Sequence, residues 1–233
     1  MILSIRRVKV LSRLNWRTVV LFVLGLVVLP AAAQISIPPS YPALVTEYDA
    51  REVSSLPKYC IYTQSFRDRV PGGNDRQQID YWYSVMGTTF HAMHHYCWGL
   101  MKINRALYLS RDTQTRRFYL NDSVNEFNYV LSNAPDDFIL LPEILTKKGQ
   151  SLVLAGRGSL GVIELERAIA LKPDYWPPYL NLSDFYRDMG DLPKARSILQ
   201  EAIAKAPEVK TLKDRLAELD KKPARGTKPG GER

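Results

Sequence analysis

Cysteine, histidine and the glycine motifs of catalytic sites are scarce in this chain of 233 residues, and each shortage narrows the possible functions. No Gly-rich phosphate loop, no nucleophile elbow and no Ser-x-x-Lys motif occurs in the sequence. Nucleotide-binding proteins, hydrolases and kinases are therefore not indicated. The three histidines and two cysteines include no Cys-x-x-Cys-His motif for covalent haem attachment. We expect a protein that is not an enzyme and needs no cofactor.

The N-terminal segment has the composition of a secretory signal peptide. Its basic residues are Arg6, Arg7, Lys9, Arg13 and Arg17. An apolar run over residues 19–29 follows them, and then come the small residues Ala31, Ala32 and Ala33. This order predicts a signal peptide over residues 1–33, cleaved near Ala33 to release a periplasmic or secreted protein. The alternative is an uncleaved anchor, since the run could span a bilayer with its flanking residues, and only then do we expect membrane association.

Positive charge is concentrated at the two ends of the chain. The net charge is +8, of which the predicted signal peptide contributes +5 and residues 221–233 contribute +4, leaving −1 for the body. A nucleic-acid-binding protein needs basic residues clustered on a folded face, so we expect no nucleic acid partner. The Lys-, Pro- and Gly-rich residues 221–233 predict a disordered tail that keeps the protein soluble or attaches weakly to an anionic surface.

Two regions are expected in the body before residue 110. Residues 34–74 show little periodicity and begin rich in proline and serine, which predicts an extended lead-in. Over residues 75–110, apolar residues recur at intervals of three and four. This pattern predicts one long helix, or two nearly collinear helices broken at Gly87. The stripe consists of Ile79, Trp82, Met86, Phe90, Met93, Cys97, Leu100, Asn104 and Leu107.

The two cysteines, Cys60 and Cys97, are candidates for a disulfide. In an exported protein an even pair of cysteines usually forms a bridge. Such a bridge would fix the lead-in to the long helical region, and closing a loop of this length stabilises a fold by about 3 to 4 kcal/mol. The alternative is that Cys97, which lies on the apolar stripe, is an ordinary buried thiol.

All three histidines lie within five residues, at His91, His94 and His95. On a helix His91 and His95 are one turn apart, the spacing that lets two imidazoles reach one metal ion. No acidic residue or free cysteine nearby completes a tetrahedral site, so two other interpretations remain open. The cluster could be a polar flank of the helix, or it could form a partner surface with the adjacent Tyr96 and Trp98.

The C-terminal half repeats itself at a spacing of 34 residues. The repeated residues are Gly156 and Gly190, Ala168 and Ala202, and Pro173 and Pro207. In the later copy, residues 179–186 carry one helical face and Gly190 ends that helix. A second apolar face follows at Ala195, Ile198, Leu199, Ala202 and Ile203. Each copy is thus expected to be a helix-turn-helix unit.

This period, with its small residues and terminal proline, resembles the tetratricopeptide repeat, whose units stack into a solenoid. The resemblance implies repeat units at residues 142–175 and 176–209 and a more degenerate unit at 104–137. A charged helix over residues 208–220 would cap the open end. The expected fold class is therefore all-α, a helix-turn-helix solenoid of this type with an N-terminal helical extension.

In the tetratricopeptide family, certain first-helix positions face a concave groove that holds peptides from partner proteins. The resemblance carries these positions to Thr146, Gln150, Val153 and Leu154 in one unit, and to Pro177, Leu180, Asp184, Arg187 and Asp188 in the next. Arg187 could receive a carboxylate through a charge-assisted pair. The alternative is that all of these are ordinary solvated positions.

Two hypotheses of function follow. The first is a non-catalytic periplasmic adaptor that binds proteins or peptides in the cell envelope, within an assembly or export system. The second is a metal- or haem-handling protein in which His91 and His95 are ligands. The sequence does not indicate an oligomeric state.

Overall fold

The computed structural model describes residues 48–221, all of which belong to one compact unit of the chain. Their regular elements are all helical, and no strand occurs in this range, which confirms the all-α prediction. Residues 1–47, with the expected signal peptide and the start of the lead-in, and residues 222–233 of the expected tail lie outside the described residues. Between residues 48 and 221 no helix has both the length and the apolar character required to cross a membrane.

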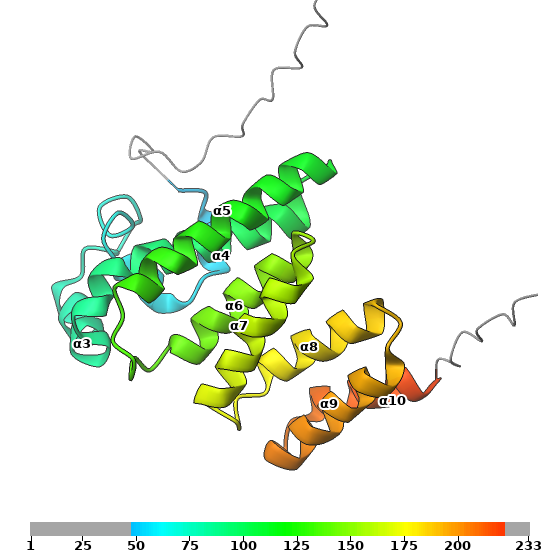
Figure 1. The fold of residues 1–233 in the computed structure, drawn as a ribbon. Coiled ribbons are helices and arrows are strands. Elements are labelled where there is room, and N and C mark those ends of the chain that lie inside the picture. The colour runs from blue at the N-terminus through cyan, green and yellow to red at the C-terminus, as the bar shows by residue number, and fades with distance from the viewer. Residues whose placement is uncertain (1–47, 222–233) are drawn as a thin grey trace, which may run out of the picture. The chain divides into compact units, whose positions relative to one another are not determined.

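The N-terminal half of the described chain is built from four α-helices and three short helical turns (Figure 1). In order these are α2 (Ala50–Ser54), the 3-10 helix η1 (Lys58–Tyr62), α3 (Arg76–Met86), the 3-10 helix η2 (Gly87–Ala92), α4 (Met93–Asn104), the π-helical turn η3 (Arg105–Leu109) and α5 (Thr113–Ser132). Asp75 and Asp112 accept hydrogen bonds from backbone amides of the first turns of α3 and α5, so each carboxylate caps the helix that it precedes. The predicted break at Gly87 is where α3 ends.

Two helix pairs and a final helix form the C-terminal half. They are α6 (Leu141–Leu154), α7 (Gly158–Leu171), α8 (Pro177–Asp188), α9 (Leu192–Lys205) and α10 (Lys210–Lys221). Gly156 and Gly190 end α6 and α8 with φ angles of 84° and 86°, a left-handed conformation that glycine adopts without strain. The two pairs occupy the expected units at 142–175 and 176–209, and α10 occupies the expected position of the cap.

Neighbouring helices along the chain pack on one another from α4 to α10. A large apolar core surrounds Phe66, Met93, Tyr96, Met101 and Phe127, where the N-terminal segment covers α4 and α5. A second core fills the space between α7, α8, α9 and α10. Each repeat thus buries its apolar faces mainly against the helices that precede and follow it in the chain.

The expected degenerate unit at residues 104–137 is not a helix pair. Residues 113–132 form the single helix α5, and its antiparallel partner is α4, which begins at Met93. The turn between the two helices lies at residues 110–112, where Asp112 caps α5. The third pair therefore spans residues 93–132 and is displaced toward the N-terminus from the expected unit.

The lead-in is not extended over its described part. Residues 50–54 are helical, residues 58–62 form η1, and turns follow to residue 74. Four long-range contacts join this segment to α4 and η3. They are the disulfide, the bidentate Glu52–Arg105 pair, the hydrogen bond that Trp98 Nε1 donates to Tyr48 Oη at 3.0 Å, and the one that Asn104 Nδ2 donates to Ser55 Oγ at 2.9 Å. None of these contacts leaves a periodic pattern in the sequence.

The predicted Cys60–Cys97 disulfide is present, with the two Cα atoms 5.8 Å apart. Both cysteines are fully buried. The bridge joins η1 to α4 across 37 residues of sequence, so it fixes the N-terminal segment to the first helix pair.

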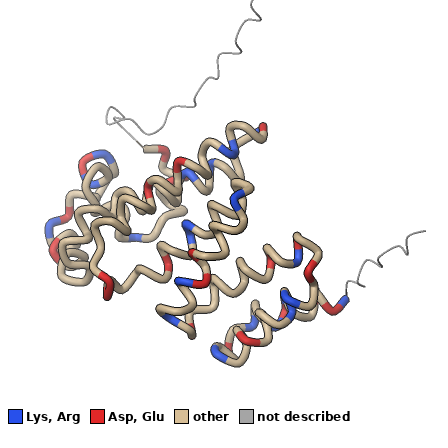
Figure 2. The backbone as a smooth tube through the Cα atoms, viewed as in Figure 1, with Lys and Arg blue, Asp and Glu red and all other residues tan. Residues whose placement is uncertain are grey.

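Figure 2 shows Lys and Arg interspersed with Asp and Glu along the helices of the described range. Much of this charge is paired: eight different Arg and four different Lys side chains take part in the ion pairs found there.

Candidate functional site

The first helices of the repeats, α6 and α8, lie side by side, and α10 continues their row. We call the surface formed by α6, α8 and α10 the first-helix face. The second helices, α7 and α9, form the other layer of the stack. All of the groove positions expected from the sequence belong to α6 or α8, so the first-helix face is where they are found.

Of the four groove residues expected in the first unit, three are buried or packed against a core, and only Gln150 remains available to a partner. Thr146 is 2% exposed, and its hydroxyl donates a hydrogen bond to the carbonyl oxygen of Pro142, so it cannot contact a partner. Leu154 packs against the cluster around Leu120, and Val153 packs against the core of the repeats. Gln150 is half-buried and keeps part of its side chain accessible.

In the second unit the expected residues form a charged network. Asp184 Oδ1 accepts hydrogen bonds from Arg187 Nη1 at 2.6 Å and from Arg215 Nη1 of α10 at 2.8 Å. Arg187 also donates to Asp188 Oδ1, with Nη2 at 2.8 Å. Leu180 lies beside this network at the edge of the repeat core, and Pro177 starts α8.

This network places charged groups at fixed positions on the first-helix face, and its guanidinium N–H groups can donate hydrogen bonds to a partner. The Arg187, Asp184 and Arg215 side chains are 24%, 32% and 28% exposed, so water reaches them but does not fully screen them. Burial and the neighbouring carboxylates Asp188 and Glu218 raise the pKa of Asp184, which the two guanidinium groups offset only in part. The sequence pattern did not identify Arg215, because α10 falls outside the repeated units.

The histidine cluster is not arranged as a metal site. His91 belongs to the 3-10 turn η2 and packs on Tyr83, whereas His95 belongs to α4 and its Nδ1 lies 2.5 Å from Glu126 Oε2. Over residues 48–221 no three His, Cys, Asp or Glu side chains gather in a way that could hold a metal ion. His94 is buried and hydrogen-bonds to the His91 carbonyl oxygen; burial first, and then His95, lower its pKa to about 4.

A buried charged cluster joins α4 to α5 beneath these histidines. Lys102 is 3% exposed, and its Nζ lies 2.7 Å from Asp122 Oδ2 and also donates to Glu126. Burial works to raise the pKa of Glu126, but the hydrogen bonds from His95 and Lys102 outweigh it, so the pKa of that carboxyl is lowered. The His95 ring packs against Tyr129 of α5, with the ring centroids 3.8 Å apart and the ring planes tilted by 30°.

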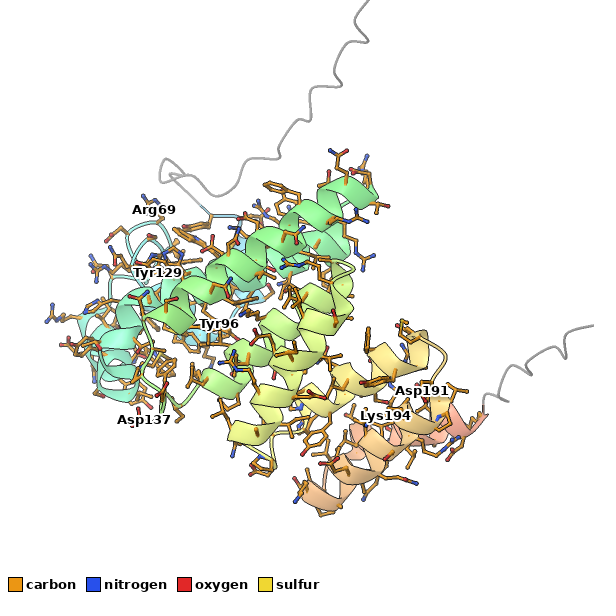
Figure 3. The ribbon with its side chains drawn as sticks, in the orientation of Figure 1. Arg69, Tyr96, Tyr129, Asp137, Asp191 and Lys194 are labelled. Atoms are coloured by element: carbon orange, nitrogen blue, oxygen red, sulfur yellow. A yellow bond between two sulfur atoms is a disulfide. The ribbon has the colours of Figure 1, made fainter. Side chains whose placement is uncertain are left out.

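Tyrosines connect the N-terminal region to the first repeat. The Tyr96 hydroxyl of α4 donates a hydrogen bond to Glu143 of α6, and Tyr96 lies at the centre of the assembly in Figure 3. Burial raises the pKa of Tyr59, and it raises that of Tyr175 to about 12, with Glu143 adding to both effects. The two tyrosines therefore stay protonated at physiological pH.

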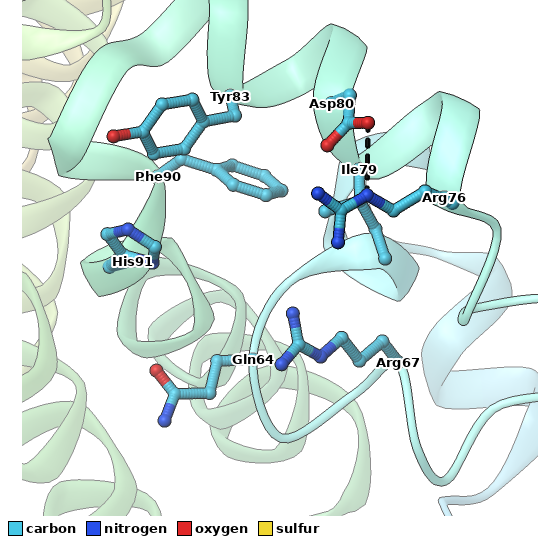
Figure 4. Close-up of a pocket in the computed structure, with 8 residues that line it drawn as sticks. All are labelled: Gln64, Arg67, Arg76, Ile79, Asp80, Tyr83, Phe90 and His91. Carbon is cyan, nitrogen blue, oxygen red and sulfur yellow. Dashed lines mark hydrogen bonds and ion pairs between the residues drawn. The ribbon is translucent and has the colours of Figure 1, made fainter.

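A cleft of about 420 Å³ opens between α3, η2 and the loop after η1 (Figure 4). The loop provides Gln64 and Arg67, α3 provides Arg76, Ile79, Asp80 and Tyr83, and η2 provides Phe90 and His91. His91, which the sequence suggested as a metal ligand, thus lines a cleft instead. No sequence pattern indicated Gln64 or Arg67, because they lie in a loop without periodicity.

Comparison with known proteins concerns only the C-terminal repeats. Residues 164–216, from the middle of α7 into α10, match the family model described as tetratricopeptide repeat. No curated protein and no solved structure matches the chain. The matched segment contains the α8–α9 pair, and α6–α7 repeats its plan at a spacing of 34 residues, including the left-handed glycine. The chain therefore carries a match to the tetratricopeptide repeat within residues 164–216.

Proposed function

We propose that the protein is a non-catalytic adaptor that binds a protein or peptide partner on its first-helix face. Tetratricopeptide repeats are interaction modules, and here the face combines apolar area at Leu180 with the Asp184–Arg187–Arg215 network. The network is the observation that carries the proposal. Partly exposed guanidinium groups at fixed positions can pair with carboxylates of a partner.

The proposed location is the cell envelope, either in the periplasm or after secretion. Two features support it: the basic and apolar N-terminal segment with Ala31, Ala32 and Ala33, and the Cys60–Cys97 disulfide. Disulfides form and persist in oxidising compartments. An envelope assembly or export system offers partners for an adaptor of this kind.

Arg187→Ala is the substitution that tests the network most cleanly. Among the described residues the ion pairs of Arg187 join it to Asp184 and Asp188 of its own helix, so the change breaks no ion pair between helices. Asp184→Ala would also release Arg215 of α10 and loosen the cap. We expect Arg187→Ala to reduce the recovery of specific partners from envelope extract by about tenfold, the loss of one charge-assisted contact.

Arg167→Ala provides the matched control. Arg167 is also a repeat arginine with an i,i+3 ion pair inside its own helix, to Glu164, but it lies on α7 outside the first-helix face. Its replacement is expected to leave partner recovery unchanged. Equal recovery with the wild-type protein and Arg187→Ala, measured by quantitative mass spectrometry of tagged pull-downs, contradicts the role of the network.

A further inference from the structure

We infer that the cleft between α3, η2 and the loop after η1 is a binding site for a carboxylate attached to an aromatic or apolar group. This site is separate from the first-helix face and does not depend on the function proposed for the repeats. Its residues come from the N-terminal half, which the tetratricopeptide-repeat match does not include.

The charge of the cleft favours an anion. Arg67, Arg76 and His91 line it, against one carboxylate, Asp80, which already holds Arg76 at 3.0 Å. The nearest carboxylate to the Arg67 guanidinium within the described residues is Asp68, at 4.0 Å, so Arg67 has little local compensation. Figure 4 shows the Arg67 and Arg76 side chains extending in the same direction, with the Arg76 guanidinium group above that of Arg67 in the view. A planar carboxylate can accept two parallel hydrogen bonds from a guanidinium group.

The opposite wall of the cleft favours a flat or apolar group. Tyr83 and Phe90 line it beside His91, whose ring centroid is 5.3 Å from that of Tyr83 (Figure 4). The Tyr83 side chain is partly exposed, and it belongs to none of the apolar cores of the described residues. Its ring is therefore available to contact a ligand. A volume of about 420 Å³ is at the lower end of small-molecule sites. A cleft of this volume can hold one aromatic ring together with a carboxylate group attached to it.

Both walls of the cleft depend on unusual backbone conformations. Ser65, between Gln64 and Arg67, has a positive φ of 69°, which costs a non-glycine residue about 1 kcal/mol or more. Gly87, between Tyr83 and Phe90, has φ 59° and ψ −150°, a combination that only glycine adopts readily. The Ser65 turn is held by Arg69, which donates to the Ser65 carbonyl oxygen at 2.8 Å, and by the disulfide at Cys60. The lining side chains are therefore positioned before a ligand arrives.

Ligand-observed NMR titration of the purified protein with two pairs of probes tests the site. One pair is 3-phenylpropanoate and its neutral amide, which represents a free aromatic acid. The other is the peptide acetyl-Gly-Ser-Gly-Phe with a free C-terminal carboxylate and the same peptide amidated, which represents a chain end. We expect both acids to bind, with the tighter acid identifying the source, and both amides to bind at least about fivefold more weakly. Acids and amides that bind equally, or no binding of any probe, overturn the inference.

Arg67→Gln and Arg116→Gln assign the binding to the cleft. Arg67→Gln keeps a polar side chain at a partly exposed position and is expected to weaken binding of both acids at least about fivefold. Arg116→Gln removes an exposed arginine of α5 that does not line the cleft and is expected to change nothing. Unchanged melting temperatures show that both variants are folded. Equal weakening by the two substitutions, or none by Arg67→Gln, overturns the assignment.

Discussion

Replacing Lys102 with methionine is expected to lower the free energy of unfolding by about 2 to 4 kcal/mol. Lys102 is the cation of the buried cluster between α4 and α5, and its removal leaves the Asp122 and Glu126 carboxylates facing each other. These carboxylates are 23% and 13% exposed, so water compensates only in part. Urea denaturation followed by far-ultraviolet circular dichroism measures the loss.

Two further variants separate electrostatics from packing at this position. Lys210→Met removes an exposed lysine whose pair with Asp214 is 2.6 Å long, and it is expected to cost less than about 0.5 kcal/mol. Adding Asp122→Asn and Glu126→Gln to Lys102→Met removes the uncompensated charges and is expected to restore part of the stability. If Lys102→Met is as stable as the wild-type protein, the cluster does not hold α4 against α5.

Loss of the Cys60–Cys97 disulfide is expected to lower the free energy of unfolding by about 3 to 4 kcal/mol. The bridge closes a loop across 37 residues, and breaking it restores that freedom to the unfolded chain. The double variant Cys60→Ala, Cys97→Ala and the reduced wild-type protein are expected to unfold at the same urea concentration, below that of the oxidised protein. Reductant is expected to have no effect on the double variant.

Hydrogen exchange locates the effect of the disulfide within the chain. The segment over residues 50–74 contacts α3, α4 and η3, and the bridge is its covalent link to α4, so it is expected to lose protection when the bridge is broken. Helices α8 and α9, whose core is separate, are expected to keep theirs. Unchanged stability on reduction, or equal loss of protection in α8 and α9, contradicts this role.

The repeats could be predicted from the sequence because each one depends only on its neighbours. Helices α6 to α9 follow from a period of 34 residues, and their ends follow from local signals such as Gly156, Gly190 and the prolines. Even so, the place of a residue within the 34-residue repeat did not predict whether its side chain is exposed. Thr146 occupies a family groove position, yet it is buried, because α6 is covered on that side.

The N-terminal half could not be predicted to the same degree, because long-range contacts shape it. The stripe and Gly87 indicated α3 and α4, and the even cysteine count indicated the disulfide. Lys102 lies off the apolar stripe, and only the carboxylates of α5 explain its burial. The cleft depends on the turn at Ser65, a residue that does not favour positive φ, so no local signal reveals it.

Site-specific photo-crosslinking in cells tests most directly whether the first-helix face binds a protein partner. A photoreactive phenylalanine analogue replaces Gln150, the accessible residue of α6 on that face, or Ser197, an exposed residue of α9 in the other layer. We predict a discrete crosslinked protein with the probe at position 150 and none with the probe at position 197. The same crosslinks from both positions, or a crosslink from position 197 alone, would contradict the account.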